Sequence, residues 1–229
     1  MRFHAVVFAI GLLLGCAPQS ETSPNVGAES MAFLSSATPS MVIEVIPTPN
    51  HGPDEAALGL LATRAGQYCG KPGGIRLQID DVAPVAPVTT GTRSWTFDQL
   101  VTLEQQYCRN HPGGGVAVLC ILYVDGTFAQ RPNAIAVSFT SHSIAFFKDM
   151  ITAGGPEGQA LVHELGHELG LVNGTTRQLV PHEDPTSVLH DVSQKCVMYY
   201  AMDPTGASVV PDDYCDKCKA DLKAALTQN

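Results

Sequence analysis

The chain has 229 residues, 13 Lys and Arg against 22 Asp and Glu, and a formal net charge of −9. Apolar residues make up 45% and charged residues 15%, which is enough for one ordinary core and too little charge for a disordered chain. One domain with a leftover tail is expected. The acidic excess argues against a nucleic-acid-binding surface, and no run reaches the roughly 20 apolar residues that span a bilayer.

The first 16 residues have the pattern of an export signal. Arg2 precedes a short apolar run at residues 5–14, and the Leu-Leu-Gly-Cys sequence that ends at Cys16 resembles the lipobox of bacterial lipoproteins. The resemblance implies cleavage before Cys16 and lipidation of its side chain. Ala17 is not the Asp that often marks inner-membrane retention, so an outer-membrane lipoprotein of the cell envelope is expected. An ordinary signal peptide with an incidental cysteine is the alternative.

Three segments follow from this interpretation of the N-terminus. Residues 1–15 would be the signal peptide. Residues 16–40 are rich in Ser, Thr, Pro, Ala and Glu and show little apolar periodicity, which predicts a lipidated flexible tether. Residues 41–229 would then form the folded domain.

Strands and helices are expected to alternate up to residue 169. Alternating or continuous apolar runs predict the strands, and apolar faces with N-terminal caps at Asp54 and Thr96 predict two of the helices. The expected strands are residues 41–46, 75–79, 116–124 and 134–139; the expected helices are 54–68, 97–110 and 156–169, and 143–151 is ambiguous. This β-α-β-α-β-β-α order predicts a mixed α/β fold, with a sheet packed against helices and a loop-rich C-terminal part.

The last of these helices carries the clearest chemical signal. His163 and His167 are four residues apart, so they project from one helical face and can share a metal ion. Glu164 lies beside them and can serve as a general base. Catalytic zinc needs three protein ligands. The pattern His-Glu-x-x-His-x-x-Gly-x-x-His would place the third at Asn173, a poor zinc ligand, so the third ligand must come from further along the chain.

The segment after this helix contains a distinctive series of His, Cys and Met residues. A His-Asp pair is followed by four residues, Cys-Val-Met, sixteen residues and Cys-Asp-Lys-Cys. Over residues 159–218 the chain resembles the archaemetzincin branch of the metzincin zinc peptidases, where a third His is followed by Cys, four residues, Cys-x-Met, about seventeen residues and Cys-x-x-Cys. The matching positions are His190, Asp191, Cys196, Met198, Cys215 and Cys218.

The resemblance implies a metzincin-like fold: a mixed, twisted sheet packed with helices, an active-site helix, and a C-terminal part with a Met-turn. It also implies Glu164 as the general base and Met198 as the Met-turn residue beneath the site. The implied ligands of the catalytic zinc are His163, His167 and His190.

Two departures from the family pattern leave the ligand sets open. Seventeen extra residues separate Gly170 from His190, so His182 or Asp184 is an alternative third ligand. The first Cys of the family's structural zinc site is Asp191 here, which leaves a Cys₃Asp set, with His182 as an alternative fourth donor. The implied structural ligands are Asp191, Cys196, Cys215 and Cys218; a Cys215–Cys218 disulfide or free thiols are the other interpretation.

Four further residues have less specific interpretations. Cys69 and Cys108 each follow a Tyr near the end of an expected helix, and we expect them to form a disulfide in an oxidising compartment. Cys120 lies within an apolar strand and is expected to be a buried thiol. Tyr200, two residues after Met198, is a candidate for stabilising the oxyanion, as in some metzincins, or is a core residue.

These observations predict a zinc-dependent peptidase tethered to a bacterial envelope membrane. The resemblance implies peptide or protein substrates that pair with an edge strand at residues 134–141. A catalytically inactive, metzincin-like binding or scaffold lipoprotein is the alternative, which Asn173 and Asp191 favour and an intact Glu164 opposes.

Overall fold

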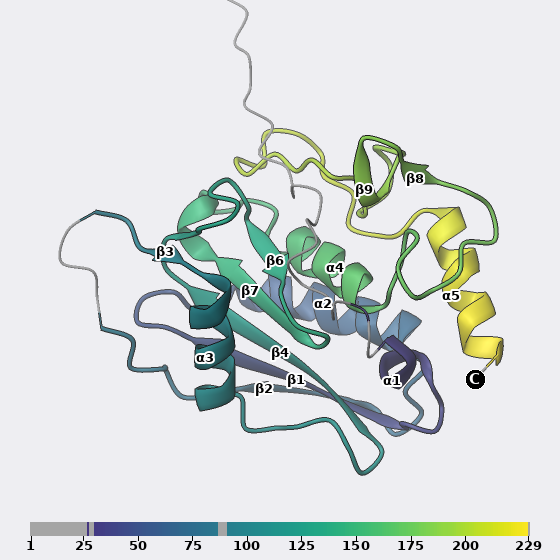
Figure 1. The fold of residues 1–229 in the computed structure, drawn as a ribbon, viewed down its shortest axis with the longest axis horizontal. Helices are drawn as coiled ribbons and strands as arrows, with labels where there is room; N and C mark the ends of the chain where they lie inside the picture. Colours follow the sequence, from purple (N-terminus) through teal and green to yellow (C-terminus); the bar gives the residue numbers. More distant parts are fainter. Residues whose placement is uncertain (1–26, 28–29, 87–90, 229) are drawn as a thin grey trace, which may run out of the picture.

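Figure 1 shows the computed structural model of the chain, which describes residues 27, 30–86 and 91–228. Its centre is a five-stranded sheet of order β2-β1-β4-β7-β6, in which the first four strands are parallel and β6 is antiparallel to β7. The five strands are β1 (Ser40–Pro47), β2 (Ile75–Ile79), β4 (Val116–Val124), β6 (Ala136–Ser138) and β7 (Ser143–Phe147). The expected mixed α/β fold with a helix-packed sheet is confirmed.

Helices cover both faces of this sheet (Figure 1). Helices α2 (Glu55–Tyr68) and α4 (Glu157–Glu168) pack on one face, and α3 (Phe97–Tyr107) packs on the other. Successive side chains of β4 alternate between these two cores, with Leu119 on the α2/α4 side and Leu122 on the α3 side. Every residue of β4 after Val116 is buried, as its continuous apolar run predicts for a central strand.

Short elements complete the described part of the chain. Two-stranded pairings join β3 (Ser94–Trp95) to β5 (Thr127–Phe128) and β8 (Glu183–Asp184) to β9 (Ser187–Asp191). A 3₁₀ turn, η1 (Lys148–Met150), follows β7, and helix α5 (Asp216–Gln228) ends the chain. Among the residues described, no helix is both long and apolar enough to cross a membrane.

The prediction that the flexible tether extends to residue 40 is wrong. Within that range, α1 (Ser30–Leu34) is a helix that packs into the core. Phe33 and Leu34 are buried, and the Lys71 ammonium donates to three carbonyl oxygens around the end of α1, including that of Ala32. The folded domain therefore starts before residue 41. Cys16 and the expected signal peptide lie outside the described residues.

The local signals placed most elements correctly and missed some of their ends. Asp54 caps α2, and Thr96 forms a capping box with Gln99 at the start of α3. Helix α3 ends at Tyr107 rather than at residue 110, because the Glu44 carboxylate accepts the backbone N–H groups of Arg109 and Asn110. The strand expected at 134–139 forms only over Ala136–Ser138.

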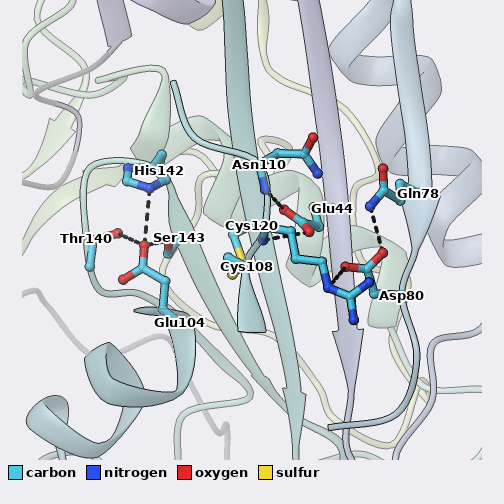
Figure 2. The surroundings of a disulfide bond; sticks show 11 residues. Glu44, Gln78, Asp80, Glu104, Cys108, Asn110, Cys120, Thr140, His142 and Ser143 are labelled. Atoms are coloured by element: carbon cyan, nitrogen blue, oxygen red, sulfur yellow. Dashed lines mark hydrogen bonds and ion pairs between the residues drawn. A yellow bond between two sulfur atoms is a disulfide. The ribbon is translucent and has the colours of Figure 1, made fainter. Parts of the chain in front are cut away.

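The expected Cys69–Cys108 disulfide is wrong, because Cys108 pairs with Cys120 (Figure 2). Cys69 ends α2 and lies in the core on that face of the sheet, whereas Cys108 and Cys120 lie in the core under α3. The sheet therefore separates Cys69 from both. Cys69 is a fully buried thiol, and burial raises its pKa to about 12. Cys120 is bonded rather than free.

Candidate metal centres

Helix α4 presents His163, Glu164 and His167 to the interior of the protein. Leu161, Leu165 and Leu169 pack into the core, and His163, Glu164 and His167 are also buried. The four-residue spacing places the Nε2 atoms of His163 and His167 3.1 Å apart. A separation of 3.1 Å suits either an N–H···N hydrogen bond between the two rings or two Nε2 lone pairs that share a metal ion.

The third imidazole of this cluster belongs to His190, at the end of β9. Its ring centroid lies 5.2 Å from that of His163 and 5.0 Å from that of His167. The candidate ligand atoms of the three histidines all lie within 4.8 Å of one another. Of the three alternatives for the third position, the structure brings His190 to the pair and leaves His182 and Asp184 outside the cluster.

The free nitrogens of the cluster fit a metal ion. His163 Nδ1 bonds to the Val197 carbonyl oxygen at 2.7 Å and His190 Nδ1 to the Val188 carbonyl at 2.9 Å, so both rings carry their proton on Nδ1. Their Nε2 lone pairs then face the cluster. Within the described residues, the buried Nε2 of His190 has no hydrogen-bond partner, which a metal ion would supply.

Burial keeps these imidazoles neutral, which is the form that binds metal. Burial lowers the pKa of His163 to about 3, with a further contribution from His190. Burial also lowers the pKa of His167, and the neighbouring histidines and Arg131 add to this effect. The His190 pKa shifts in the same direction for the same main reason. The three ligands therefore need no deprotonation near neutral pH.

Glu164 is held at the junction between α4 and the edge strand β6. Its Oε2 accepts the backbone N–H of Ser138 at 2.7 Å, and its own carbonyl oxygen accepts the Ser138 hydroxyl at 3.1 Å. The carboxylate is thus fixed in orientation next to both histidines of its helix. The sequence marks Glu164 but carries no local signal for Ser138, which reaches it only through the folding of the sheet.

Met198 lies directly beneath α4. A Cβ on Gly166 would come within 2.2 Å of the Met198 sulfur and 3.0 Å of Tyr214 Cε1, so this helix position has room only for glycine. The carbonyl oxygens of Val197 and Met198 each bond to a candidate metal-binding residue. The Val197 oxygen orients His163, and the Met198 oxygen accepts the N–H of Asp191 at 2.8 Å. Met198, the residue predicted for the Met-turn, therefore lies against the helix that carries His163 and His167.

A second group of donors lies on the other side of β9. Asp191, Cys196, Cys215 and Cys218 offer ligand atoms that all lie within 4.8 Å of one another. Asp191 Oδ2 lies 3.1 Å from Cys215 Sγ, and Cys196 Sγ lies 3.7 Å from Cys218 Sγ. No disulfide joins these cysteines in the described chain. Three thiols and one carboxylate in a tetrahedron-sized space fit a zinc ion.

His182 adjoins this second group without belonging to the set of four. Its Nε2 is 3.4 Å from Cys218 Sγ and 3.7 Å from both Asp191 Oδ2 and Asp221 Oδ2. Its Nδ1 bonds to the Val180 carbonyl oxygen. His182 therefore packs against these four donors without joining them. The β8–β9 pairing, which the sequence does not reveal, places His190 rather than His182 beside His163 and His167.

Asp184 belongs to neither donor cluster, and Tyr200 is predicted as an oxyanion donor only from its place in the sequence. The Tyr200 ring is half-buried against Tyr199, with centroids 4.7 Å apart, and its oxyanion role stays a prediction. Asp184 is half-buried and accepts the backbone N–H and hydroxyl of Thr186 at 2.7 Å, so it shapes the turn between β8 and β9.

The fold has relatives among solved structures. Archaemetzincin from Methanopyrus kandleri matches it with a TM-score of 0.54 at 16% identity, over 82% of this chain and 96% of that one. Archaemetzincin from Archaeoglobus fulgidus has a TM-score of 0.42 at 11% identity, covering 80% and 99% of the two chains. Metalloproteinase-II from Bacteroides fragilis has a TM-score of 0.48 at 16% identity, covering 95% and 57%.

Comparisons by sequence alone return nothing: no family model matches the chain, and neither does any curated protein. The structural likeness shows an archaemetzincin-like fold. The two donor clusters are features of the chain's own residues.

Proposed function

We propose that this chain is a zinc-dependent peptidase with Glu164 as its general base. The observation that carries the proposal is the convergence of His163, His167 and His190 from two distant segments, with ligand atoms within 4.8 Å of one another beside Glu164. The archaemetzincin-like fold agrees with this activity.

The protein's own groups define the chemistry expected at this site. A zinc ion there would act as a Lewis acid that polarises the scissile carbonyl and acidifies a water molecule. Glu164 would take the proton of the attacking water and deliver it to the leaving amine. The Ser138 N–H holds one oxygen of this carboxylate in place.

A peptide substrate would lie along β6, the last strand in the order of the sheet. Val137 pairs with Ala145 of β7, so the other edge of β6 faces away from the rest of the sheet. Main-chain pairing at that edge would align an extended peptide beside Glu164 without requiring particular side chains.

Replacing Glu164 by Gln tests the assigned base. We expect cleavage of a peptide substrate to fall by at least about 100-fold, because Gln cannot accept the proton. The zinc content should stay that of the wild type, since Glu164 is not a ligand; metal analysis of the same preparations checks this. A His163→Ala control should lose both zinc and cleavage. Cleavage that survives in Glu164→Gln would refute the role.

We also propose a second, structural zinc at Asp191, Cys196, Cys215 and Cys218. It would join the end of strand β9 to the start of helix α5. The full proposal predicts two zinc ions per chain.

The proposal includes a lipid anchor at Cys16, which rests on the Leu-Leu-Gly-Cys sequence alone. We expect the protein to fractionate with the outer membrane of an expressing bacterium, and mass spectrometry of its first peptide to show a lipid on Cys16. Cys16→Ser should release the protein into the soluble fraction. An unmodified N-terminal peptide in the wild type would overturn this part and leave the peptidase proposal intact.

A further inference from the structure

The extra segment between α4 and His190 contains a chain of hydrogen bonds that ends at the zinc-binding histidine. Asn173 stands where the strict metzincin pattern has its third His, and its Nδ2 donates to Glu183 Oε2 at 2.9 Å. The other carboxylate oxygen, Glu183 Oε1, accepts the backbone N–H of Leu189 at 2.8 Å. The two carboxylate oxygens of Glu183 therefore accept hydrogen bonds from opposite ends of this segment, one from Asn173 and one from Leu189.

The peptide bond between Val188 and Leu189 connects Glu183 to His190. Its N–H faces the Glu183 carboxylate, and its carbonyl oxygen accepts His190 Nδ1 at 2.9 Å. A peptide unit is planar and rigid, so fixing the direction of its N–H also fixes the direction of its C=O. A carboxylate at the N–H end also makes the carbonyl a stronger acceptor, because hydrogen bonds in a chain polarise one another.

Leu189 holds a backbone conformation that this arrangement has to maintain. Its φ is +66°, in the left-handed region that side-chain-bearing residues other than Asn and Asp rarely occupy. The turn brings the Val188 carbonyl back toward the ring of His190, two residues along the chain. Without the Glu183 contact, nothing in this hydrogen-bond chain would oppose relaxation of Leu189 to a negative φ, which would swing the carbonyl away from Nδ1.

We propose that Glu183 is a positioning residue for the third metal ligand, acting on His190 through the Val188–Leu189 peptide and itself oriented by Asn173. The inference rests on the proposed zinc site of three histidines and adds residues that hold one ligand of that site. The strict metzincin pattern has a His ligand at the position of Asn173. In this chain Asn173 and Glu183 instead help to position His190, the ligand that comes from further along the chain.

Asp184 provides a matched comparison for Glu183. It is the next residue in the same hairpin and also carries a carboxylate. Its hydrogen bonds go to Thr186, in the turn, and not to the peptide before His190. Replacing either residue by Ala removes one negative charge near His190, so a difference between the two variants reports the hydrogen bonds of Glu183 to Leu189 and Asn173 rather than the loss of charge.

The experiment measures metal affinity rather than activity. Full-length wild type, Glu183→Ala, Glu183→Gln, Asn173→Ala and Asp184→Ala are titrated with Zn²⁺ against a chromophoric chelator. Co²⁺ then replaces Zn²⁺: its visible bands report ligand geometry at the histidine site, and its near-ultraviolet thiolate absorption reports the cysteine site separately. Thermal unfolding of each variant records stability alongside.

We expect Glu183→Ala to weaken Zn²⁺ binding at the histidine site about tenfold and to shift its Co²⁺ bands, with the cysteine site unchanged. Glu183→Gln keeps an acceptor for Leu189 N–H and should stay within about threefold of wild type. Asn173→Ala should fall between these variants. Asp184→Ala should bind as wild type does.

A rescue variant tests the mechanism directly. Glycine adopts positive φ as readily as negative φ, so adding Leu189→Gly to Glu183→Ala should restore at least about a third of the lost affinity. Three results would overturn the inference: equal affinity of Glu183→Ala and wild type, equal losses in Glu183→Ala and Asp184→Ala, or a parallel loss at both metal sites. A wild type that binds no Zn²⁺ at the histidines would instead refute the proposed function.

Discussion

Gly166 has no side chain, and this lets Met198 pack closely against the helix that carries His163 and His167. The residue lies between the two histidines of α4, where an added Cβ would meet the sulfur of Met198. Met198 is fully buried, and the carbonyl of the preceding residue orients His163. The space at Gly166 therefore governs how closely Met198 approaches the helix that carries His163 and His167.

We predict that Gly166→Ala lowers the free energy of unfolding by about 1–3 kcal/mol, because overpacking against Met198 and Tyr214 outweighs the gain in helix propensity. Urea denaturation at equilibrium measures the change.

Gly59, in α2, is the matched control for this substitution, since a Cβ there would meet no atom within 4 Å. Gly59→Ala should stabilise the protein by roughly 0.5–1 kcal/mol. If both substitutions stabilise the fold, the close packing of Met198 on α4 has no energetic weight.

At the scale of elements, α3 is tied to the sheet by polar contacts of its buried Glu104 and by a disulfide at its C-terminal end (Figure 2). Glu104 accepts hydrogen bonds from Ser143 and His142 at the start of β7, and the Cys108–Cys120 disulfide joins the end of α3 to β4. Burial alone would raise the pKa of Glu104, but the bonds from His142 and Ser143 outweigh it and lower the pKa below its ordinary value of 4.5.

The direction of this shift predicts a pH-dependent contribution to stability. A carboxyl group whose folded-state pKa is depressed stabilises the fold above its unfolded-state pKa, and that contribution is lost as pH falls through the folded-state pKa. We therefore expect Glu104→Gln to be less stable than wild type at pH 7, with the difference shrinking below pH 4.5. Urea denaturation of both proteins across this range measures it; a difference independent of pH would contradict the assignment.

The elements also show which parts of the fold the sequence could predict. Asp54 and Thr96 are local cap signals, and they placed α2 and α3 correctly at their N-termini. The C-terminal end of α3 depends on Glu44, some 65 residues away in sequence, and no local pattern reveals it. Helix α1 was missed for a similar reason, because Phe33 is buried only when the rest of the core is present.

The candidate site divides in the same way. His163, Glu164 and His167 follow from a local spacing, since a helix fixes their geometry. The choice among His182, Asp184 and His190 depends on the β8–β9 pairing, which places His190 against α4. The Cys108–Cys120 pairing likewise follows from strand and helix placement rather than from the spacing of cysteines.

At the scale of the whole molecule, the C-terminal part is joined to the sheet and α4 by apolar side chains such as Met198, Tyr214 and Leu222 and by the two donor clusters. Helix α5 supplies Cys218, β9 supplies His190 and Asp191, and α4 supplies the other two histidines. Because metal ions bound only by the folded state stabilise it, zinc at these points would hold this part of the chain in place.

We predict that a strong chelator lowers the thermal midpoint of unfolding and exposes the C-terminal part selectively. Hydrogen exchange should accelerate first in β8, β9 and α5, while β1 and β4 stay protected, since their packing involves no metal. Zn²⁺ added back should restore protection. Uniform exchange after chelation would show that the metals do not hold this region.

His190 and Asp191 are neighbours in the chain, yet they belong to different clusters. Successive residues of a strand point to opposite sides, so β9 contributes one residue to each donor cluster. A one-residue insertion or deletion between Asp184 and His190 would turn the carboxylate toward the imidazoles and the imidazole toward the thiols. We therefore expect changes in the length of the β8–β9 hairpin to disrupt both donor clusters together, because neighbouring residues of one short strand belong to each.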